Sequence, residues 1–324
     1  MGKTKIEWTA TVNPDGTVTQ GRTWNPTRGC ALVSEGCRHC YAMKFAHRFS
    51  GAGRPYEGLT EIGPDGPRWT GKVVTLPDRL DEPRSWRKPS RIFVNSMSDL
   101  FHEDVPEEFI GHVFTTMFRC RQHTFQILTK RPAEMLDLIG NAETRWGPFA
   151  EGHWPLPNVW LGVSVEDQKT ADERIPLLLQ TPAAVRFVSY EPAIGPVEFD
   201  CGPGKAGPHR YFSAEIDHPE DARIDWVICG GESGPGARPM HPDWARSARD
   251  QCVAAGVPFF FKQHGAWLHR DAMTDQQFQL IDQVENLANT SQEYFRVGKK
   301  AAGRLLDGRE WNELPKNRII SGGE

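Results

Sequence analysis

The chain contains 324 residues, and its 38 Lys and Arg against 42 Asp and Glu give a formal net charge of −4, which excludes a strongly basic nucleic-acid coat protein. Hydrophobic residues make up 38% and charged residues 25% of the chain, a balance that is typical of a folded protein and argues against intrinsic disorder. No apolar run approaches the roughly 20 residues that span a bilayer, and no signal peptide is evident, so we expect a cytoplasmic protein without a membrane partner.

Two short extended runs begin the chain, at residues 7–12 and 17–20. They lie on either side of Asn13-Pro14-Asp15-Gly16, a strong turn signal. This pattern predicts an N-terminal hairpin. We expect a loop over residues 24–30, which contain Asn, Pro and Gly but no apolar period.

A helix is predicted from about Arg38 to Phe49. Tyr41, Phe45 and Phe49 recur at a spacing of four residues, with Ala42 and Ala46 beside them, so we expect one apolar stripe that faces the core. Residues 50–90 are rich in Gly, Pro and Arg, with a short strand at 72–76, and we interpret them as an elaboration of the fold rather than a separate domain.

From residue 91 onward, short apolar runs alternate with amphipathic segments of helical length. The runs are Arg91–Asn95, Thr124–Leu128, Val159–Val165, Val185–Ser189, Trp226–Ile228 and Pro258–Phe261. The helical segments begin near Val105, Pro132, Ala171 and Pro242. Continuous apolar runs are typical of strands that are covered on both faces, so the pattern predicts an α/β fold with a parallel sheet.

Polar residues follow each of these runs. They are Ser96, Ser98 and Asp99, then Thr129, Lys130 and Arg131, then Ser164 and Glu166, then Glu191, Glu232, and finally Lys262 with Gln263. The carboxyl ends of parallel strands meet at one edge of a sheet, where ligands bind. We therefore predict one shared hydrophilic pocket.

The regular alternation is interrupted by two long loops, at residues 140–158 and 193–224, which are typical of lids or insertions. The tail contains one expected helix from Thr274 to about Tyr294, and a basic segment follows it. We expect residues 1–267 to form the main α/β unit and residues 268–324 to form an extension packed on it.

Three of the seven cysteines, Cys30, Cys37 and Cys40, form a C-x6-C-x2-C pattern. Thiolates are soft ligands for zinc or iron. A structural zinc ion would need a fourth ligand such as His39 or His47, whereas a four-iron cluster held by three cysteines leaves one iron open. Three buried thiols without a ligand are a further alternative. We favour the iron–sulfur interpretation.

Seven stretches resemble a three-cysteine phage-protein family of poorly defined function, and the match runs nearly end to end. They are Lys5-Ile6-Glu7-Trp8, Trp24-Asn25-Pro26, the cysteine triplet with Tyr41-Ala42, residues 93–101, residues 127–132, residues 160–166 and Gly230-Gly231-Glu232-Ser233-Gly234. That family is in turn similar to radical S-adenosylmethionine (SAM) enzymes, including spore photoproduct lyase. Classical members carry C-x3-C-x2-C, so the first spacing here is three residues longer.

The resemblance implies a partial (β/α)6 TIM-like barrel with the iron–sulfur loop at residues 30–40. It also implies a [4Fe–4S] cluster, SAM bound at the open iron, a reducing electron donor, and hydrogen abstraction by a 5′-deoxyadenosyl radical. The reaction class would be that of a lyase or an oxidoreductase. The substrate is unknown, although the likeness to a DNA-lesion lyase makes nucleic acid a candidate.

Roles for the polar residues follow from the chemistry of SAM. The candidates are Asn95, Ser96, Ser98 and Asp99 for the methionyl amino group, Lys130 for the carboxylate, Ser164 and Glu166 for the ribose, and Glu191 and Glu232 for the sulfonium, ribose or substrate. The alternative for each is a structural role, because polar residues at strand ends often only satisfy backbone groups.

Two other functions stay open. One is a zinc-dependent hydrolase on the same barrel. The other is a non-enzymatic nucleic-acid-binding phage-type protein that uses Lys299, Lys300 and Arg304 together with surface Trp residues.

Overall fold

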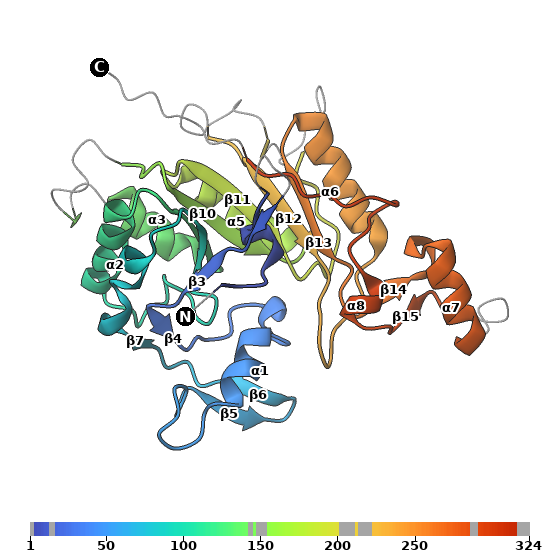
Figure 1. The fold of residues 1–324 in the computed structure, drawn as a ribbon, viewed down its shortest axis with the longest axis horizontal. Helices are drawn as coiled ribbons and strands as arrows, with labels where there is room; N and C mark the ends of the chain where they lie inside the picture. The colour runs from blue at the N-terminus through green and yellow to red at the C-terminus, as the bar shows by residue number, and fades with distance from the viewer. Residues whose placement is uncertain are drawn as a thin grey trace.

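A seven-stranded parallel sheet, curled into a half-barrel, forms the centre of the molecule (Figure 1). The computed structural model describes residues 3–12, 17–141, 145–146, 154–200, 211–212, 222–285 and 291–315. In spatial order the strands are β13 (Phe259–Gln263), β12 (Trp226–Gly230), β11 (Val185–Tyr190), β10 (Val159–Val165), β9 (Thr124–Thr129), β8 (Arg91–Val94) and β3 (Arg22–Trp24). All neighbouring pairs in this sheet are parallel. The predicted partial TIM-like barrel is confirmed.

Helices cover the outer face of the sheet. They are α2 (Glu107–Arg119), α3 (Pro132–Gly140), α5 (Gln168–Gln180) and α6 (Pro242–Ala255). Helix α5 packs on β10 and β11, and α6 packs on β12 and β13, with the largest apolar cluster between the two layers. Every residue of β10 is buried, as expected for a strand covered on both faces. The six strands and four helices expected after residue 91 are therefore confirmed, with ends shifted by a few residues at most.

A seventh strand, not expected from the sequence, ends at Trp24, the first residue of the predicted loop. Strand β3 pairs with β8 in the register Arg22↔Ile92 and Trp24↔Val94. Beyond it, β4 (Thr27–Arg28) pairs antiparallel with β7 (Val74–Thr75). The loop prediction was wrong at these positions, because segments of two or three residues have no readable period and their pairing depends on distant partners. Trp24 is fully buried at the sheet edge.

Helix α1 (Tyr41–His47) packs through a different face from the one expected. Its buried residues are Ala42, Met43 and Ala46, which contact the small sheet formed by β5 (Thr60–Gly63) and β6 (Gly66–Trp69). Tyr41, Phe45 and Phe49 are 57%, 47% and 38% exposed, so the predicted core stripe was wrong for these three residues and right for Ala42 and Ala46. Both faces of this short helix carry apolar residues, and the side chains of the buried face are the ones that fit under the β5–β6 sheet.

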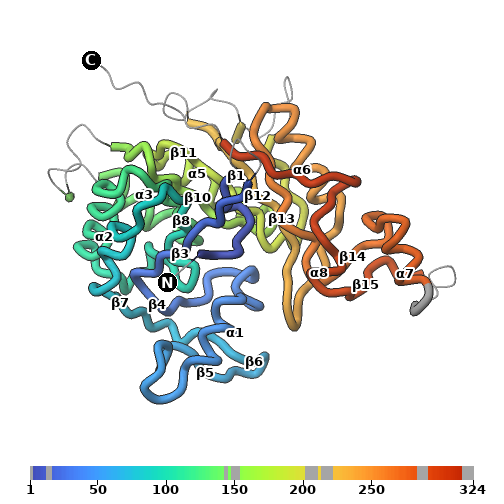
Figure 2. The backbone as a smooth tube through the Cα atoms, in the orientation of Figure 1, coloured from blue at the N-terminus to red at the C-terminus, as the bar shows by residue number. Residues whose placement is uncertain are grey.

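The inside of the half-barrel is filled with aromatic side chains. Trp8, in the short 3-10 helix η1 (Glu7–Thr9), has its ring 4.8 Å from that of Phe93 and 6.2 Å from that of Trp226. Helix η1 contacts both β8 and β13, so the N-terminal segment crosses the open side of the barrel; Figure 2 shows its blue trace in front of the sheet. The predicted hairpin is confirmed for β1 (Thr11–Val12) and β2 (Val18–Thr19), but residues 7–9 of its expected first strand form η1 instead. The turn at 13–16 lies outside the described residues.

The C-terminal part adds smaller elements beside β13 (Figure 1). These are β14 (Leu268–His269), α7 (Asp275–Glu285), β15 (Tyr294–Phe295) and α8 (Lys299–Ala302), and the remaining 3-10 helices are η2 (Glu35–Cys37), η3 (Pro77–Arg79), η4 (Glu82–Ser85) and η6 (Arg270–Ala272). Helix α7 is described to residue 285, and residues 286–290 lie outside the described part, as do most of the two expected long loops. No helix within the described ranges is both long and apolar enough to cross a bilayer.

Candidate functional site

The three cysteines of the C-x6-C-x2-C pattern line one small chamber of about 160 Å³. Cys30 follows β4, Cys37 ends η2, and Cys40 is the N-cap residue of α1. The chamber lies against the carboxyl ends of β8, β9 and β10, and none of the three thiols forms a disulfide. Within the described ranges, no three His, Cys, Asp or Glu side chains are arranged around a single metal ion. The cysteines therefore surround a chamber rather than one coordination point.

Gly36 allows the loop over residues 30–40, here called the cysteine loop, to lie directly on Glu166, at the end of β10. A Cβ atom added to Gly36 would lie 2.4 Å from Glu166 Oε1, closer than any real contact. The hydroxyl of Ser34 donates a hydrogen bond to the same oxygen at 2.9 Å. The loop between Cys30 and Cys37 is thus fixed to the sheet edge at Glu166, because Gly36 leaves room for the carboxylate and Ser34 donates a hydrogen bond to it.

Glu166 is only 1% exposed, and its carboxylate is occupied by groups of the protein itself. Arg174 Nη1, from α5, lies 3.2 Å from both of its oxygens, and Lys130 Nζ forms an ion pair with Oε1. A buried carboxylate between two cations needs such partners, because desolvation would otherwise disfavour its charged form. The sequence suggested Glu166 as a ribose ligand, but its oxygens point into this network.

Asp99 is the second buried carboxylate on this side of the site. It accepts hydrogen bonds from Thr129 Oγ1 at 2.8 Å and from the backbone N–H of Lys130 at 3.1 Å. It also lies 3.4 Å from Arg131 Nη1. Asp99 therefore fixes the chain just after β9, and this places the side chains of Lys130 and Arg131 against the chamber.

The chamber holds thiols of different acidity. Burial, together with the nearby Asp99 carboxylate, raises the pKa of Cys30 to about 12. Burial also acts on Cys37, but the Lys130 ammonium and the backbone N–H groups of Val33 and Ser34 outweigh it and lower its pKa below the ordinary value. Burial lowers the pKa of Lys130 to about 8. A metal cation bound in the chamber would favour the thiolate form of all three cysteines.

Asn95 lines this chamber and has one buried acceptor without a partner among the described residues. It has a left-handed backbone (φ 59°), is 3% exposed, and its Nδ2 donates to Thr27 Oγ1 at 2.9 Å. Its Oδ1 is buried and has no hydrogen-bond partner among the described residues. By contrast, the hydroxyls of Ser96 and Ser98 donate to Asn25 Oδ1 and to the backbone oxygen of Thr27. The two serines hold the turn, whereas the Asn95 oxygen is buried without a described partner.

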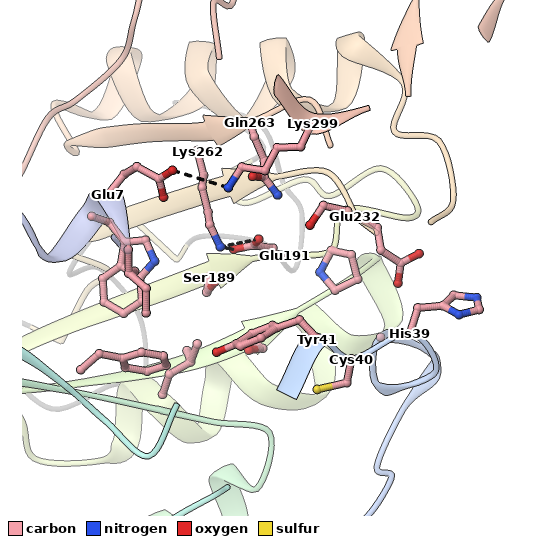
Figure 3. Close-up of a pocket in the computed structure, with 18 of the residues that line it drawn as sticks. Glu7, His39, Cys40, Tyr41, Ser189, Glu191, Glu232, Lys262, Gln263 and Lys299 are labelled. Atoms are coloured by element: carbon pink, nitrogen blue, oxygen red, sulfur yellow. Dashed lines mark hydrogen bonds and ion pairs between the residues drawn. The ribbon is translucent and has the colours of Figure 1, made fainter. Parts of the chain in front are cut away.

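A larger cavity of about 440 Å³ adjoins the chamber and shares Cys40, Tyr41, Lys130 and Ser164 with it. Figure 3 shows Glu7, Gln263 and Lys299 on one side of this cavity, Glu191 and Lys262 in the middle, and Tyr41 and Cys40 on the opposite side. Apolar side chains complete the wall: Ile6, Trp8, Phe93 and Leu128. The cavity combines an apolar lining with a few charged groups, as ligand sites commonly do.

Three ion pairs border the cavity. Lys262 Nζ lies 2.7 and 2.9 Å from the two oxygens of Glu191, and Lys299 Nζ lies 3.5 Å from Glu7 Oε1 (Figure 3). The third pair joins Glu232 to Arg238, whose Nε and Nη2 both lie 3.0 Å from the carboxylate. Arg238 Nη2 also donates to the backbone oxygen of Glu35. The pair therefore connects the glycine-rich loop after β12 (residues 230–236) to the cysteine loop.

Gln263, at the end of β13, resembles Asn95 in having an acceptor to spare. Its Nε2 donates to the backbone oxygen of Gly231 at 2.9 Å, while its buried Oε1 has no partner among the described residues. Two amide oxygens from opposite halves of the sheet are thus buried without a hydrogen-bond partner among the described residues.

Residues 3–315 match the family model described as a protein of unknown function, DUF5131. The chain belongs to the DUF5131 family. Searches of the curated proteins and of the solved structures gave no match. The family assignment covers nearly the whole chain and carries no activity with it, which agrees with the expected family of poorly defined function.

The structure of this DUF5131 member brings most of the predicted site residues together. Eight of the nine polar candidates line the chamber or the cavity: Asn95, Ser96, Ser98, Asp99, Lys130, Ser164, Glu191 and Glu232. The ninth, Glu166, lies beneath the cysteine loop and borders a neighbouring cavity. The predicted shared pocket therefore exists, although several of its members are held by internal partners.

Sequence reasoning missed the N-terminal segment and the arginines. Residues 4–8 line the cavity, and Arg174 and Arg238 hold the two carboxylates next to the cysteine loop. A signal for the first was present, because Lys5-Ile6-Glu7-Trp8 belongs to the stretches that carry the family resemblance. The arginines gave no signal, since each lies several residues beyond a strand end.

Proposed function

We propose that this protein is a radical SAM-type enzyme whose Cys30, Cys37 and Cys40 bind a [4Fe–4S] cluster. The observation that carries the proposal is the convergence of the three thiols on one buried chamber, which opens beside a 440 Å³ cavity at the carboxyl ends of parallel strands. When bound and reduced, such a cluster would supply the electron that cleaves SAM, and the resulting 5′-deoxyadenosyl radical would abstract hydrogen from a substrate.

The charges around the chamber support a cluster. Three cysteine thiolates together with an iron–sulfur core carry net negative charge, and burying it requires nearby cations. Lys130 and Arg131 both line the chamber. A zinc hydrolase, the alternative, finds no three-ligand arrangement for one ion within the described residues.

Four of the predicted polar residues are candidates for direct contact with SAM or the substrate. Asn95 Oδ1 is the best acceptor for the methionyl amino group, because it is buried beside the cysteines and has no described partner. The Ser164 hydroxyl borders both the chamber and the cavity, and it is our candidate for a ribose contact. Glu191 and Glu232 lie farther along the cavity wall and would contact SAM or the substrate.

The remaining polar candidates position these groups rather than touch the ligand. Asp99 and Glu166 hold Lys130, Arg131 and the cysteine loop, and Ser96 and Ser98 hold the turn that carries Asn95. The aromatic layer around Trp8 closes the cavity floor, which would exclude water from a radical reaction. The reaction class would be that of a lyase or an oxidoreductase, and an external electron donor would be required.

Anaerobic reconstitution with iron and sulfide tests this proposal. We expect a brown protein with about four irons and four sulfides per chain, whose visible absorbance bleaches with dithionite. Single alanine substitutions at Cys30, Cys37 or Cys40 should abolish the colour. The matched controls are Cys120→Ala, Cys229→Ala and Cys252→Ala, which remove buried thiols elsewhere and should load normally. A colourless wild type, or equal loading of both sets, would contradict the proposal.

A further inference from the structure

The exposed face of α1 and of the turn after it carries aromatic side chains, of which the first, Tyr41, lines the cavity. Tyr41, Phe45 and Phe49 lie four residues apart, and the rings of Phe45 and Phe49 are 5.1 Å from each other. All three are more than a third exposed. Tyr41 also lines both the cavity and the chamber, so the exposed face is continuous with the candidate site.

The segment that carries these rings has no acidic residue. Residues 36–56 contain Arg38, Lys44, Arg48 and Arg54 but neither Asp nor Glu, in a chain whose net charge is −4. Arg48 is exposed, and it forms no ion pair with a carboxylate in the described part of the chain. A second acid-free stretch, residues 294–306, carries Arg296, Lys299, Lys300 and Arg304.

The two basic stretches lie on either side of one loop. Lys44, from α1, donates a hydrogen bond to the backbone oxygen of Pro235. Arg296, just before α8, donates to the backbone oxygen of Gly234 at 3.2 Å. Lys299 lines the cavity itself. The loop that contains Gly234 and Pro235 therefore joins both basic stretches next to the cavity, which Ser233 and Lys299 line.

We propose that this surface binds a single strand of nucleic acid, with bases stacked on Phe45 and Phe49 and phosphates held by Arg48 and Lys300. Exposed rings interleaved with cations are the chemistry of single-strand binding, because the rings need base faces that a duplex hides. Arg38, Lys299 and Arg304 are paired with carboxylates from outside the two stretches. A protein partner would explain the rings alone, but Arg48 and Lys300 are exposed and have no ion pair among the described residues, which favours a polyanion. The binding surface stands on these observations, and only the assignment of the strand as substrate rests on the proposed function.

Fluorescence anisotropy with labelled oligothymidylate and oligouridylate of about 20 nucleotides tests the surface on the cluster-free full chain. We expect binding that Phe45→Ala/Phe49→Ala weakens by about tenfold per ring. Arg48→Ala/Lys300→Ala should make the slope of log K against log salt shallower by about 1.4, the value for two lost phosphate contacts on a single strand. The ratio of the two oligonucleotides distinguishes DNA from RNA.

Matched controls remove the same kinds of side chain elsewhere. Val253→Ala/Leu280→Ala shortens two exposed apolar side chains on α6 and α7, and Arg87→Ala/Lys88→Ala removes two exposed cations before β8, at the opposite edge of the sheet. Both controls should bind as the wild type does. All four variants should also load iron normally, so a failure of binding is distinguishable from a failure of the cluster proposal.

Three outcomes would overturn the inference. One is unchanged affinity in the Phe45 and Phe49 variant. The second is tighter binding of a duplex of the same length than of the single strand. The third is a concentration-dependent dimer in sedimentation that the Phe45→Ala/Phe49→Ala substitutions dissolve, which would identify the occupant of the face as a second copy of the chain.

Discussion

The carboxyl ends of the first strands and of the last strands carry similar polar residues but use them differently. At the ends of β8, β9 and β10, the carboxylates of Asp99 and Glu166 are saturated by protein donors. At the ends of β11 and β13, Ser189, Glu191 and Gln263 line an open cavity. The difference arises because the cysteine loop covers the first half of the edge and leaves the second half accessible.

This comparison shows that a polar strand end has two functions in one barrel. On the covered half, the carboxylates bind cations that in turn face the cysteines, so they position the loop. On the accessible half, Glu191 is also paired, with Lys262, but both side chains stay partly exposed at the cavity wall, where a ligand can contact them. Substitutions on the two halves should therefore separate effects on stability from effects on binding.

Glu166→Ala should have the largest effect on stability. It leaves Lys130 and Arg174 buried without their shared carboxylate, and breaking a buried pair in this way costs about 3–5 kcal/mol. Urea denaturation of the metal-free protein measures the change in the free energy of unfolding. Glu173→Ala, an exposed glutamate on α5, is the control and should change it by less than about 0.5 kcal/mol. A loss below about 1 kcal/mol in the Glu166 variant would contradict the assigned role.

Gly36→Ala should have the next largest effect. Its methyl group would meet the Glu166 carboxylate, and such overpacking typically costs about 1–3 kcal/mol. The cysteine loop would lift from the sheet edge, so reconstituted iron should fall as well. The control is Gly51→Ala, where an added methyl group makes only an ordinary contact at 3.9 Å with Arg54. Iron loading equal to that of the control would show that the loop does not need this close approach.

Glu191→Gln should have a small effect on stability and a larger effect on SAM binding. Glu191 and Lys262 are partly exposed at the cavity wall, so the stability change should stay near 1 kcal/mol or below. Iron content should not change, because neither residue lines the cysteine chamber. SAM affinity, measured by equilibrium dialysis on the reconstituted protein, should fall by about tenfold, as for the loss of one charged contact. Loss of iron with unchanged SAM affinity would contradict the proposal that Glu191 contacts the ligand and does not support the cysteine loop.

The smallest expected effect is a difference between Cys37 and Cys30 in the pH at which each thiol becomes reactive. Because Lys130 and two backbone N–H groups lower the pKa of Cys37 while burial raises that of Cys30 to about 12, Cys37 should form its thiolate at the lower pH. In the metal-free protein, alkylation by iodoacetamide, followed by mass spectrometry of the peptides, should modify Cys37 before Cys30 as the pH rises. Lys130→Met should shift the Cys37 profile to higher pH. Identical profiles for the two thiols would rule out this electrostatic asymmetry.

Much of the barrel was readable from the sequence because its strands are long, apolar and covered on both faces. Strand β10 was predicted at its observed limits, Val159–Val165. Strand β3 was missed because a three-residue segment shows no hydrophobic periodicity, and its pairing with β8 depends on the tertiary structure. The exposed face of α1 was misassigned because two apolar stripes lie side by side on seven residues, and only the β5–β6 sheet decides which is covered.

The candidate site was predictable as a set of positions but not as a set of roles. The order of the strands fixed which residues meet at the edge, so eight of the nine polar candidates line the two hollows. Whether each faces a ligand or the protein depends on where the cysteine loop lies and on arginines from distant elements. Arg174 and Arg238 therefore decide the roles of Glu166 and Glu232, and a linear pattern does not contain these contacts.

The most direct test of SAM chemistry at this site is to incubate the reconstituted, dithionite-reduced protein with SAM and to quantify 5′-deoxyadenosine by mass spectrometry. We predict 5′-deoxyadenosine from the wild type and from Glu173→Ala, and none above the buffer control from Cys37→Ala. A wild-type protein that carries a full complement of iron and sulfide yet forms no 5′-deoxyadenosine would contradict the proposed function.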